Sequence, residues 1–583
     1  MLCYTAKNMS PRLFARFFAV FVVGATFWAP HASADILGQR EAFFVNAGFD
    51  VTHRQGLDAT LHRVSERAYW YLEDAAWNEL SSVDRTRVSE ALLALATEFD
   101  TRIYPITTAT WGSEARPGVD GDPRVTILLH RLNQGAGGYF DTIHSYSVQQ
   151  AQGTNAREMV VVNFDALLSR QSHIFLAHEF QHLISLNQKE FTSGISEDVW
   201  LNELRAEYTV SLMGYNTPFE GSSLESRVDT LKRFPTDSAL VWVGARADYG
   251  QVALFAEYLV GRYGEGILRD TLHSNSSGTA SLDAWLVSRG YRERFTDVIT
   301  DWWIANMVNN AVADPRFGYT RLELANIRVQ PSFVALARQD TEHVAVAEIE
   351  SWEPVTHDFR VADVLASGES AVRITMNGDP RGVWKVRVVT ESSDGVLRAY
   401  DVPIGNATAT FVVEPGHDIE RILLAGAHIG QQGNWEQSLV LQWEARMRTI
   451  PISEIGSSEL VIPGTPTDLE GALVKRNNAE TEMYVITRGY KRYLRPEIIA
   501  LYGHLDPSKV IPLDGAAFDG YQTASYIRVD GDQKVYAVWP DGTKHWLRMS
   551  GAQFGASGRD WNAIFTVSTA EAAAYKTGAD ITQ

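Results

Sequence analysis

The sequence predicts a multidomain protein with an α+β domain, then a β-sandwich-like domain, then a repeat of short β-hairpin units. Its 583 residues are too many for one hydrophobic core. Helical and strand patterns mix in the first half of the chain, and short strands separated by turn signals follow. The tail contains an internal repeat with a period of about 53 residues.

Composition restricts the class of protein. Charged residues make up 21% of the chain and hydrophobic residues 45%, which is ordinary for folded globular protein. The net charge of −19 disfavours nucleic acid or an anionic membrane as a partner. We therefore expect no nucleic-acid partner.

Residues 1–34 resemble a secretory signal peptide. A basic start is followed by the apolar run 17–23, and Ala32-Ser33-Ala34 forms an A-x-A cleavage site. We expect cleavage near Ala34 and a location outside the cell or at its surface. The alternative is an uncleaved membrane anchor, for which the apolar run is short. Cys3 is the only cysteine, so the mature chain would hold no disulfide.

The α+β domain is expected over residues 35–325. Residues 124–129 and 159–163 are β-branched runs and are predicted to be strands. From Leu167 onwards helical patterns dominate, including segments 200–213 and 249–263. An earlier helix is indicated by an apolar stripe at helical spacing, formed by Val88, Leu92, Leu95 and Phe99.

A β-sandwich-like domain is expected over residues 335–450. Residues 384–389 and 396–400 have the composition of strands, and Asp394-Gly395 lies between them. This dipeptide is a strong hairpin signal because glycine accepts the positive φ of a tight turn. Residues 439–443 are predicted to be a further strand.

Residues 465–583 are expected to hold two copies of the repeat. Lys491 and Lys544, and likewise Leu494 and Leu547, occupy equivalent positions. Each copy is predicted to be a hairpin followed by a short helix or loop. Aromatic residues beside basic ones suggest binding of a cell-envelope glycan, and ordinary hairpin packing is the alternative.

The strongest functional motif is His178-Glu179-Phe180-Gln181-His182, an H-E-x-x-H sequence. Residues four apart share one face of a helix, so His178 and His182 can bind one metal ion. Glu179 lies about 100° around the helix from His178. It can therefore reach a water at the metal and act as general base. The alternative is a helix with two structural histidines.

The third ligand decides the class of metal site. A metzincin needs glycine at position 185 and histidine at 188, and these positions hold Ser185 and Gln188. Glu203 and Glu207 are four apart on a predicted helix. One of them can bind the metal while the other fixes the tautomer of a ligand histidine.

Other carboxylates compete with this pair. Glu197 and Asp198 lie close in sequence and are expected to begin the helix. The alternative for Glu203 and Glu207 is that both are solvated carboxylates on a helix surface.

The residues H-E-F-Q-H-L-I together with W-L-N-E-x-x-A-E-Y resemble the gluzincin clan, and within it the hyicolysin family of secreted neutral metallopeptidases. The resemblance covers residues 35–320. It implies a gluzincin-type catalytic domain with His178, His182 and Glu203 as zinc ligands and Glu179 as general base. Glu207 would orient a ligand histidine. Leu204-Arg205 departs from the family pattern and is expected to alter the shape and charge of the pocket.

A hydrolase of this type also needs a donor for the oxyanion of its intermediate. Tyr249 resembles the tyrosine with this role in gluzincin aminopeptidases, although Val252 stands where those enzymes have glycine. An ordinary core or capping role is the alternative for Tyr249. Tyr208 and Tyr215 are weaker candidates for the oxyanion donor.

Two further features bear on substrate and ions. Residues 158–163 are predicted to be an edge strand that pairs with an extended peptide, and no G-A-M-E-N segment of aminopeptidases precedes the motif; both favour an endopeptidase. Asp120-Gly121-Asp122 is a possible Ca²⁺ site, and a plain turn is the alternative.

The sequence therefore predicts a secreted zinc metalloendopeptidase acting on proteins or peptides. The alternative is a cell-surface glycan-binding or envelope-binding protein with a vestigial peptidase domain.

Overall fold

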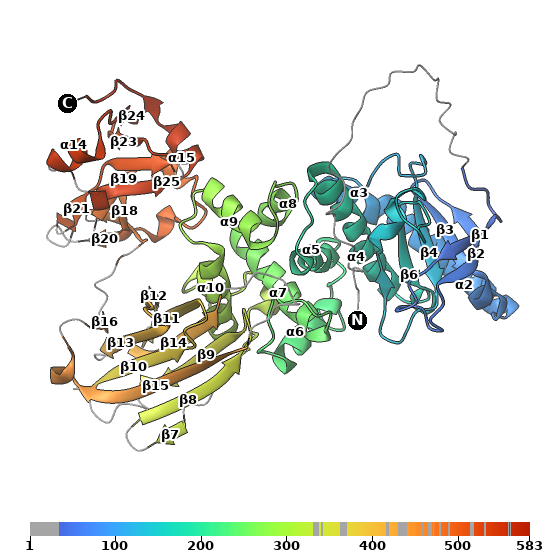
Figure 1. Cartoon of the computed structure of the whole chain (residues 1–583), viewed down its shortest axis with the longest axis horizontal. Helices are drawn as coiled ribbons and strands as arrows, with labels where there is room; N and C mark the ends of the chain where they lie inside the picture. Colours follow the sequence, from blue (N-terminus) through green and yellow to red (C-terminus); the bar gives the residue numbers. More distant parts are fainter. Residues whose placement is uncertain are drawn as a thin grey trace.

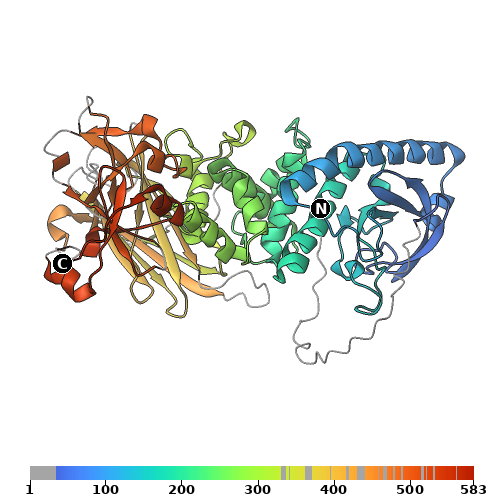
Figure 2. The ribbon, with the colours of Figure 1, turned by 90° about the horizontal axis from the view of Figure 1, so that it is seen from above.

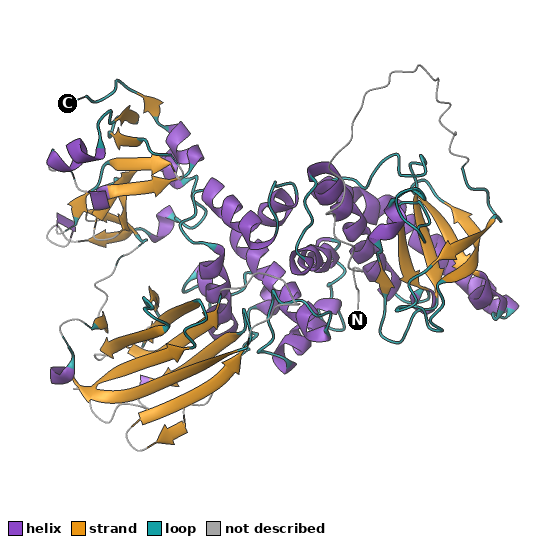
Figure 3. Cartoon of the chain, in the orientation of Figure 1, coloured by secondary structure: helices purple, strands orange, loops and turns teal. Residues whose placement is uncertain are grey.

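The computed structural model describes residues 34–329 continuously. Beyond them it describes 337–582 except 340–341, 362–369, 394, 415–418, 430–439, 457–458, 464–468, 470, 477–479, 488–489, 514–517, 520, 530–531, 558 and 560. The predicted signal peptide lies outside this range except for Ala34. The chain is a multidomain α+β protein in which a helical region separates a mixed sheet at one end from strand-rich parts at the other (Figure 1, Figure 3).

The first sheet has the strand order β1-β2-β3-β4-β6-β5. The neighbours β3, β4 and β6 run parallel, whereas the outer pairs are antiparallel. Apolar side chains fill both faces of the sheet, which explains why its inner strands are continuous apolar runs. The strands are β1 (Arg40–Phe44), β2 (Gly56–Val64), β3 (Ala68–Glu73), β4 (Val125–His130), β5 (Gly138–Tyr139) and β6 (Met159–Asn163).

The prediction of an edge strand at 158–163 is wrong. β6 lies between β4 and β5, with Val161 paired to Leu128 on one side and to Tyr139 on the other. The edge strand next to β6 is β5, which has only two residues. A strand this short carries no periodic pattern, so the sequence could not reveal it.

Helices cover one face of this sheet and then build a bundle of their own. The stripe of Val88, Leu92, Leu95 and Phe99 is buried, and α2 runs along the sheet in Figure 2. A short π-helical turn (Phe99–Ile103) continues α2 into α3, and another (Leu186–Phe191) continues α4. The helices are α1 (Asp74–Asn78), α2 (Ser82–Glu98), α3 (Tyr104–Trp111), α4 (Gln171–Ser185), α5 (Val199–Leu212), α6 (Ser223–Arg233), α7 (Arg246–Tyr263), α8 (Gly266–Leu272), α9 (Gly278–Ser288) and α10 (Phe295–Val308).

Two sheets follow and pack face to face around one apolar cluster. Their orders are β16-β13-β10-β15-β8-β7 and β12-β11-β14-β9. The hairpin predicted around Gly395 is present, with β11 and β12 antiparallel and Gly395 at φ 81°; Asp394 lies outside the described residues. The strands are β7 (Ala337–Gln339), β8 (Glu342–Ile349), β9 (Pro354–Arg360), β10 (Ser370–Gly378), β11 (Trp384–Ser392), β12 (Leu397–Asp401), β13 (Thr408–Glu414), β14 (Ile419–His428), β15 (Leu441–Pro451) and β16 (Leu460–Pro463).

The core of the first half of the chain continues into this strand-rich region. Val389 on β11 and Leu423 on β14 belong to the same buried cluster as Trp302 on α10. The four-stranded sheet therefore has two buried faces, one toward its partner sheet and one toward α10. The boundary predicted between residues 325 and 335 crosses a shared core.

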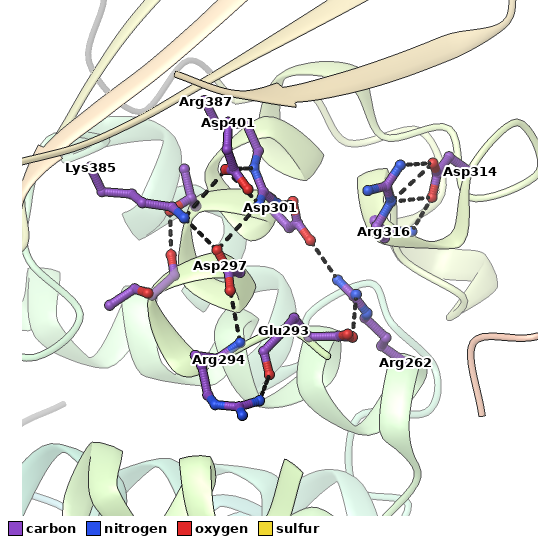
Figure 4. A network of polar contacts seen from close by, with 12 residues as sticks. Arg262, Glu293, Arg294, Asp297, Asp301, Asp314, Arg316, Lys385, Arg387 and Asp401 are labelled. Atoms are coloured by element: carbon purple, nitrogen blue, oxygen red, sulfur yellow. Dashed lines mark hydrogen bonds and ion pairs between the residues drawn. The ribbon is translucent and has the colours of Figure 1, made fainter. Parts of the chain in front are cut away.

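A buried ion network joins α10 to β11 (Figure 4). Asp301 is 1% exposed and binds both Arg387 of β11 and Arg262 of α7, the latter at 2.9 Å. One turn earlier, Asp297 binds Lys385. Because these charges are removed from water, each depends on its partners. The network fixes the four-stranded sheet against α10.

The two repeat copies share one topology. Each is a five-stranded sheet, ordered β20-β17-β18-β19-β21 in the first copy and β25-β22-β23-β24-β26 in the second. The unit is therefore larger than the predicted hairpin. Its strands are β17 (Leu473–Arg476), β18 (Met483–Thr487), β19 (Tyr490–Leu494), β20 (Ile511–Leu513) and β21 (Gln522–Thr523), then β22 (Tyr526–Val529), β23 (Val535–Val538), β24 (Thr543–Trp546), β25 (Ile564–Val567) and β26 (Lys576–Thr577), with helices α12 (Pro496–Ile499), α14 (Gly551–Ala556) and α15 (Thr569–Ala574).

The repeated lysines have a structural role in both copies. Lys491 donates to the carbonyls of Phe518 and Tyr521 at 2.8 and 2.6 Å, and Lys544 donates to the carbonyl of Ala572. Ammonium groups used on backbone carbonyls are poorly placed to bind an external glycan. Trp539, which lies between β23 and β24, is 48% exposed.

Within the described residues, none of the helices combines the length and hydropathy that a membrane crossing requires.

We predict that Asp301→Asn destabilises the chain by about 3–5 kcal/mol, because it leaves two buried guanidinium groups without their shared carboxylate. Urea unfolding followed by tryptophan fluorescence measures this loss. The control is Asp379→Asn, whose partner Arg381 is solvent-exposed, and little change is expected there. Equal unfolding midpoints for the two variants would show that the network does not stabilise the junction.

Candidate metal centre

The H-E-x-x-H motif lies in the middle of α4. Phe180, Leu183 and Ile184 are buried in the main core, so the helix is anchored on its apolar side. His178 and His182 stand one turn apart on the same face. Both imidazoles are buried, with exposures of 3% and 1%.

Helix α5 packs against α4 and brings Glu203 to the two histidines. The Glu203 Oε2 atom lies 3.2 Å from Nε2 of His178 and 3.5 Å from Nε2 of His182. The two Nε2 atoms are 3.2 Å apart. These residues form the group in the described part of the chain whose ligand atoms gather closely enough to hold a metal ion.

The spacing of the three atoms matches a tetrahedral metal site. Bonds of about 2.0–2.2 Å to nitrogen and oxygen at tetrahedral angles place neighbouring ligand atoms roughly 3.3–3.6 Å apart. The three observed separations of 3.2, 3.2 and 3.5 Å are close to these edges. Glu203 is fully buried, and its Oε1 atom has no hydrogen-bond partner in the described part of the chain. The donor set therefore fits a divalent cation.

The ligands also perturb each other's protonation. Burial opposes the charged form of His178, but the hydrogen bond to Glu203 and the charges of Glu179, Glu203 and Glu207 outweigh burial and raise its pKa to about 9. Burial likewise opposes ionisation of Glu203, yet the two imidazoles lower its pKa to about 2. Without metal, the cluster holds a proton that a cation would displace.

Glu207 approaches the other side of His178. Its Oε1 atom lies 3.6 Å from Nδ1 of His178, which favours the tautomer that leaves Nε2 as a ligand. Arg227 of α6 holds the Glu207 carboxylate with two hydrogen bonds of 2.9 and 2.5 Å. Both side chains are buried, with exposures of 6% and 5%. Sequence reasoning missed Arg227, because nothing local marks a contact from another helix.

Tyr249 lies behind Arg227. Its ring centre is 4.9 Å from the guanidinium carbon of Arg227 and also 4.9 Å from the ring of Trp242. This places the tyrosine on the Glu207 side of His178, in the apolar core. Its role as oxyanion donor stays a prediction. The weaker candidates are engaged elsewhere, since Tyr208 donates to Glu265 and Tyr215 donates to Glu98.

The general-base candidate Glu179 lies against the edge strand. A Cβ atom at Gly138 of β5 would stand 2.9 Å from Cγ and 3.2 Å from Oε1 of Glu179, and 2.6 Å from the Val161 carbonyl oxygen. Such close approach requires glycine at position 138. Glu179 therefore packs directly against the edge strand β5.

The competing acids are used in structure. Asp198 precedes the first turn of α5, as expected. Glu197 binds the fully buried Arg205 at 2.7 Å. Arg205 also donates to the carbonyl of Leu268 and the hydroxyl of Thr271. The charge that departs from the family pattern is therefore neutralised.

Asp120-Gly121-Asp122 forms a turn with Gly121 at φ 79°. Asp122 accepts hydrogen bonds from Tyr69 and from the backbone of Arg124, and Asp120 accepts one from the backbone of Asp122. These contacts occupy carboxylate oxygens that a calcium ion would use. The Ca²⁺ site stays a prediction.

An open hollow of about 370 Å³ adjoins the edge strand. The segment 135–137 before β5 forms one wall, and Phe175, one turn before His178 on α4, forms another. Gly137 packs tightly on the Phe175 ring. The hollow is therefore formed jointly by the segment before β5 and by α4.

Comparison with known proteins gives no relative on which a function can rest. No family model and no curated protein matches the chain. Among solved structures, a chain from "Structure of infectious bursal disease virus Gx strain" matches 21% of this chain and 34% of its own length, at 12% identity and a TM-score of 0.13. A TM-score this low carries no argument about fold or function.

We predict that zinc binding at about pH 7.5 releases at least about one proton, because the pKa of His178 is raised to about 9 and only its neutral imidazole can bind the metal. Zinc affinity should accordingly rise with pH up to about 9. Calorimetric titration of chelator-treated protein in buffers of different ionisation enthalpy measures the released protons. Binding enthalpies that do not depend on the buffer would contradict the assignment of His178 as a protonated ligand.

Proposed function

We propose that the protein is a zinc-dependent endopeptidase that is secreted or displayed at the cell surface. The observation that carries this proposal is the tetrahedral spacing of Nε2 of His178, Nε2 of His182 and Oε2 of Glu203. Two imidazoles and one carboxylate, with a fourth position left for water, are the ligand set of zinc peptidases. The resemblance of the motifs to the hyicolysin family agrees with this.

The residues around the ligands suit peptide hydrolysis. When bound, zinc would supply Lewis acidity toward a water molecule and a carbonyl oxygen. The Glu179 carboxylate accepts a proton from the attacking water and delivers it to the leaving amine. Glu207, held by Arg227, keeps the imidazole of His178 in its ligand tautomer.

The sheet edge supports an endopeptidase. β5 is paired with β6 on one side only, so its other side can pair with an extended peptide. Glu179 lies against this strand. A peptide that paired with β5 would therefore run past the general base in an extended conformation. An internal peptide bond can then be presented without recognition of a chain end.

We predict that Glu179→Gln retains zinc and loses hydrolysis by about 10²–10⁴-fold, because the amide cannot accept the proton. Cleavage of a quenched fluorescent peptide together with elemental analysis gives both readouts. His182→Ala and Glu203→Ala should lose zinc as well as activity. Glu90→Gln, an exposed carboxylate on α2, is the matched control. Wild-type activity in Glu179→Gln would remove the general base from the proposal.

We predict that Gly138→Ala lowers kcat at least about tenfold with zinc retained, because the added methyl group displaces either Glu179 or β5. Gly405→Ala is the matched control, since a Cβ atom there meets no atom within 4 Å. Steady-state kinetics and metal content check both variants. Unchanged kcat in Gly138→Ala would contradict the roles proposed for Glu179 and β5 together.

A further inference from the structure

A second site lies far along the chain from the metal ligands, where the turn between α9 and α10 meets the repeat units. A cavity of about 220 Å³ opens between residues 287–294 and strands from both copies, β18, β19 and β25. Its volume equals that of about seven water molecules. Neither His178 nor any residue of α4 or α5 contributes to its described wall.

The wall combines positive charge with apolar surface. Arg292, Arg294 and Arg492 line the cavity, and no aspartate or glutamate is among the described residues of its wall. Leu505 and Phe565 supply apolar surface. The chain as a whole has a net charge of −19, so its long-range electrostatic field repels anions. An anion can therefore be attracted only by local positive charge such as that of this pocket.

The buried arginine of the wall is held by an ion pair. Arg492 is 4% exposed, and both of its Nη atoms bind the fully buried Glu571. Its Nε atom is buried and has no hydrogen-bond partner in the described part of the chain. Arg492 therefore holds the wall of the cavity in place through its ion pair with Glu571.

Arg294 and the α9–α10 turn that carries it are held in place by local contacts. Arg294 donates to the carbonyls of Tyr291 and Arg292, which holds its guanidinium on the turn. The Tyr291 hydroxyl lies against Gly503, and Gly290 lies against the Tyr502 ring. The α9–α10 turn and the first repeat therefore interlock, and the cavity is preformed by this contact.

From this lining we propose that the cavity binds a small carboxylate with an apolar body, about the size of one apolar amino acid. The carboxylate would pair with Arg292 and Arg294, and the body would contact Leu505 and Phe565. Two sources offer this chemistry: the C-terminal residue of a peptide, and a free organic acid.

The test uses the full chain after removal of metal with a chelator, so that carboxylates cannot bind the metal ligands. Isothermal titration compares N-acetylphenylalanine with its amide, and 3-phenylpropionate with 3-phenylpropanol. We expect each acid to bind at least about tenfold more tightly than its neutral counterpart, since only the acid pairs with the arginines. Binding of the amino-acid derivative alone indicates a chain terminus, and binding of both acids indicates any small apolar acid.

Two variants locate the binding to this cavity. Arg292→Gln removes one charge, and Thr566→Trp fills the space from the exposed Thr566 of the wall; both should weaken acid binding at least about tenfold. Arg269→Gln, a solvent-exposed arginine on α8, is the matched control and should bind as wild type. Thermal melting confirms that each variant is folded, and Arg292→Gln decides the question if Thr566→Trp does not fold.

Three results would overturn the proposal. They are the absence of saturable binding by either acid, equal affinity for the acids and their neutral counterparts, and unchanged affinity in Arg292→Gln. Because the titration contains no zinc and measures no cleavage, its outcome is independent of the proposed peptidase activity.

Discussion

The structure depends on one electrostatic constraint. Three ligand atoms, each with a lone pair, lie close together inside the protein. Nε2 of His178, Nε2 of His182 and Oε2 of Glu203 lie within 3.5 Å of one another and almost out of reach of water. Electron-rich atoms repel each other at this distance unless a proton or a cation lies among them. The raised pKa of His178 expresses the same requirement. α4 and α5 pack in an arrangement that a shared positive charge stabilises.

The surrounding helices hold this arrangement through a sequence of buried contacts. Glu207 follows Glu203 by one turn and is tied to Arg227 on α6, which lies on Tyr249 of α7. At the other end of α7, Arg262 shares Asp301 with Arg387 of β11. The metal ligands and the four-stranded sheet are thus connected through a single helix. The face of the four-stranded sheet that is turned toward α10 belongs to the same core as the helices.

The local parts of this architecture could be predicted from the sequence. The two histidines, β4, β6 and the helix containing Glu203 follow from short-range periodicity, which one segment carries alone. The partner of Glu207, the position of β6 inside the sheet and the two-residue edge strand β5 depend on long-range packing, which leaves no local pattern. The change from helical patterns to short strands predicts a domain boundary between residues 325 and 335, but Val389 and Trp302 share one core across it.

The two copies of the repeat agree at some equivalent positions and differ at others. The equivalent lysines Lys491 and Lys544 bind backbone carbonyls within their own copies, so their recurrence reflects folding. Arg492, in contrast, corresponds to His545 in the second copy and binds Glu571 across the junction of the two copies. Because the second copy has histidine at the equivalent position, this ion pair is not repeated there, and the repeated fold does not require it. The ion pair lies where the two copies meet, and Arg492 also lines the cavity that contacts the α9–α10 turn.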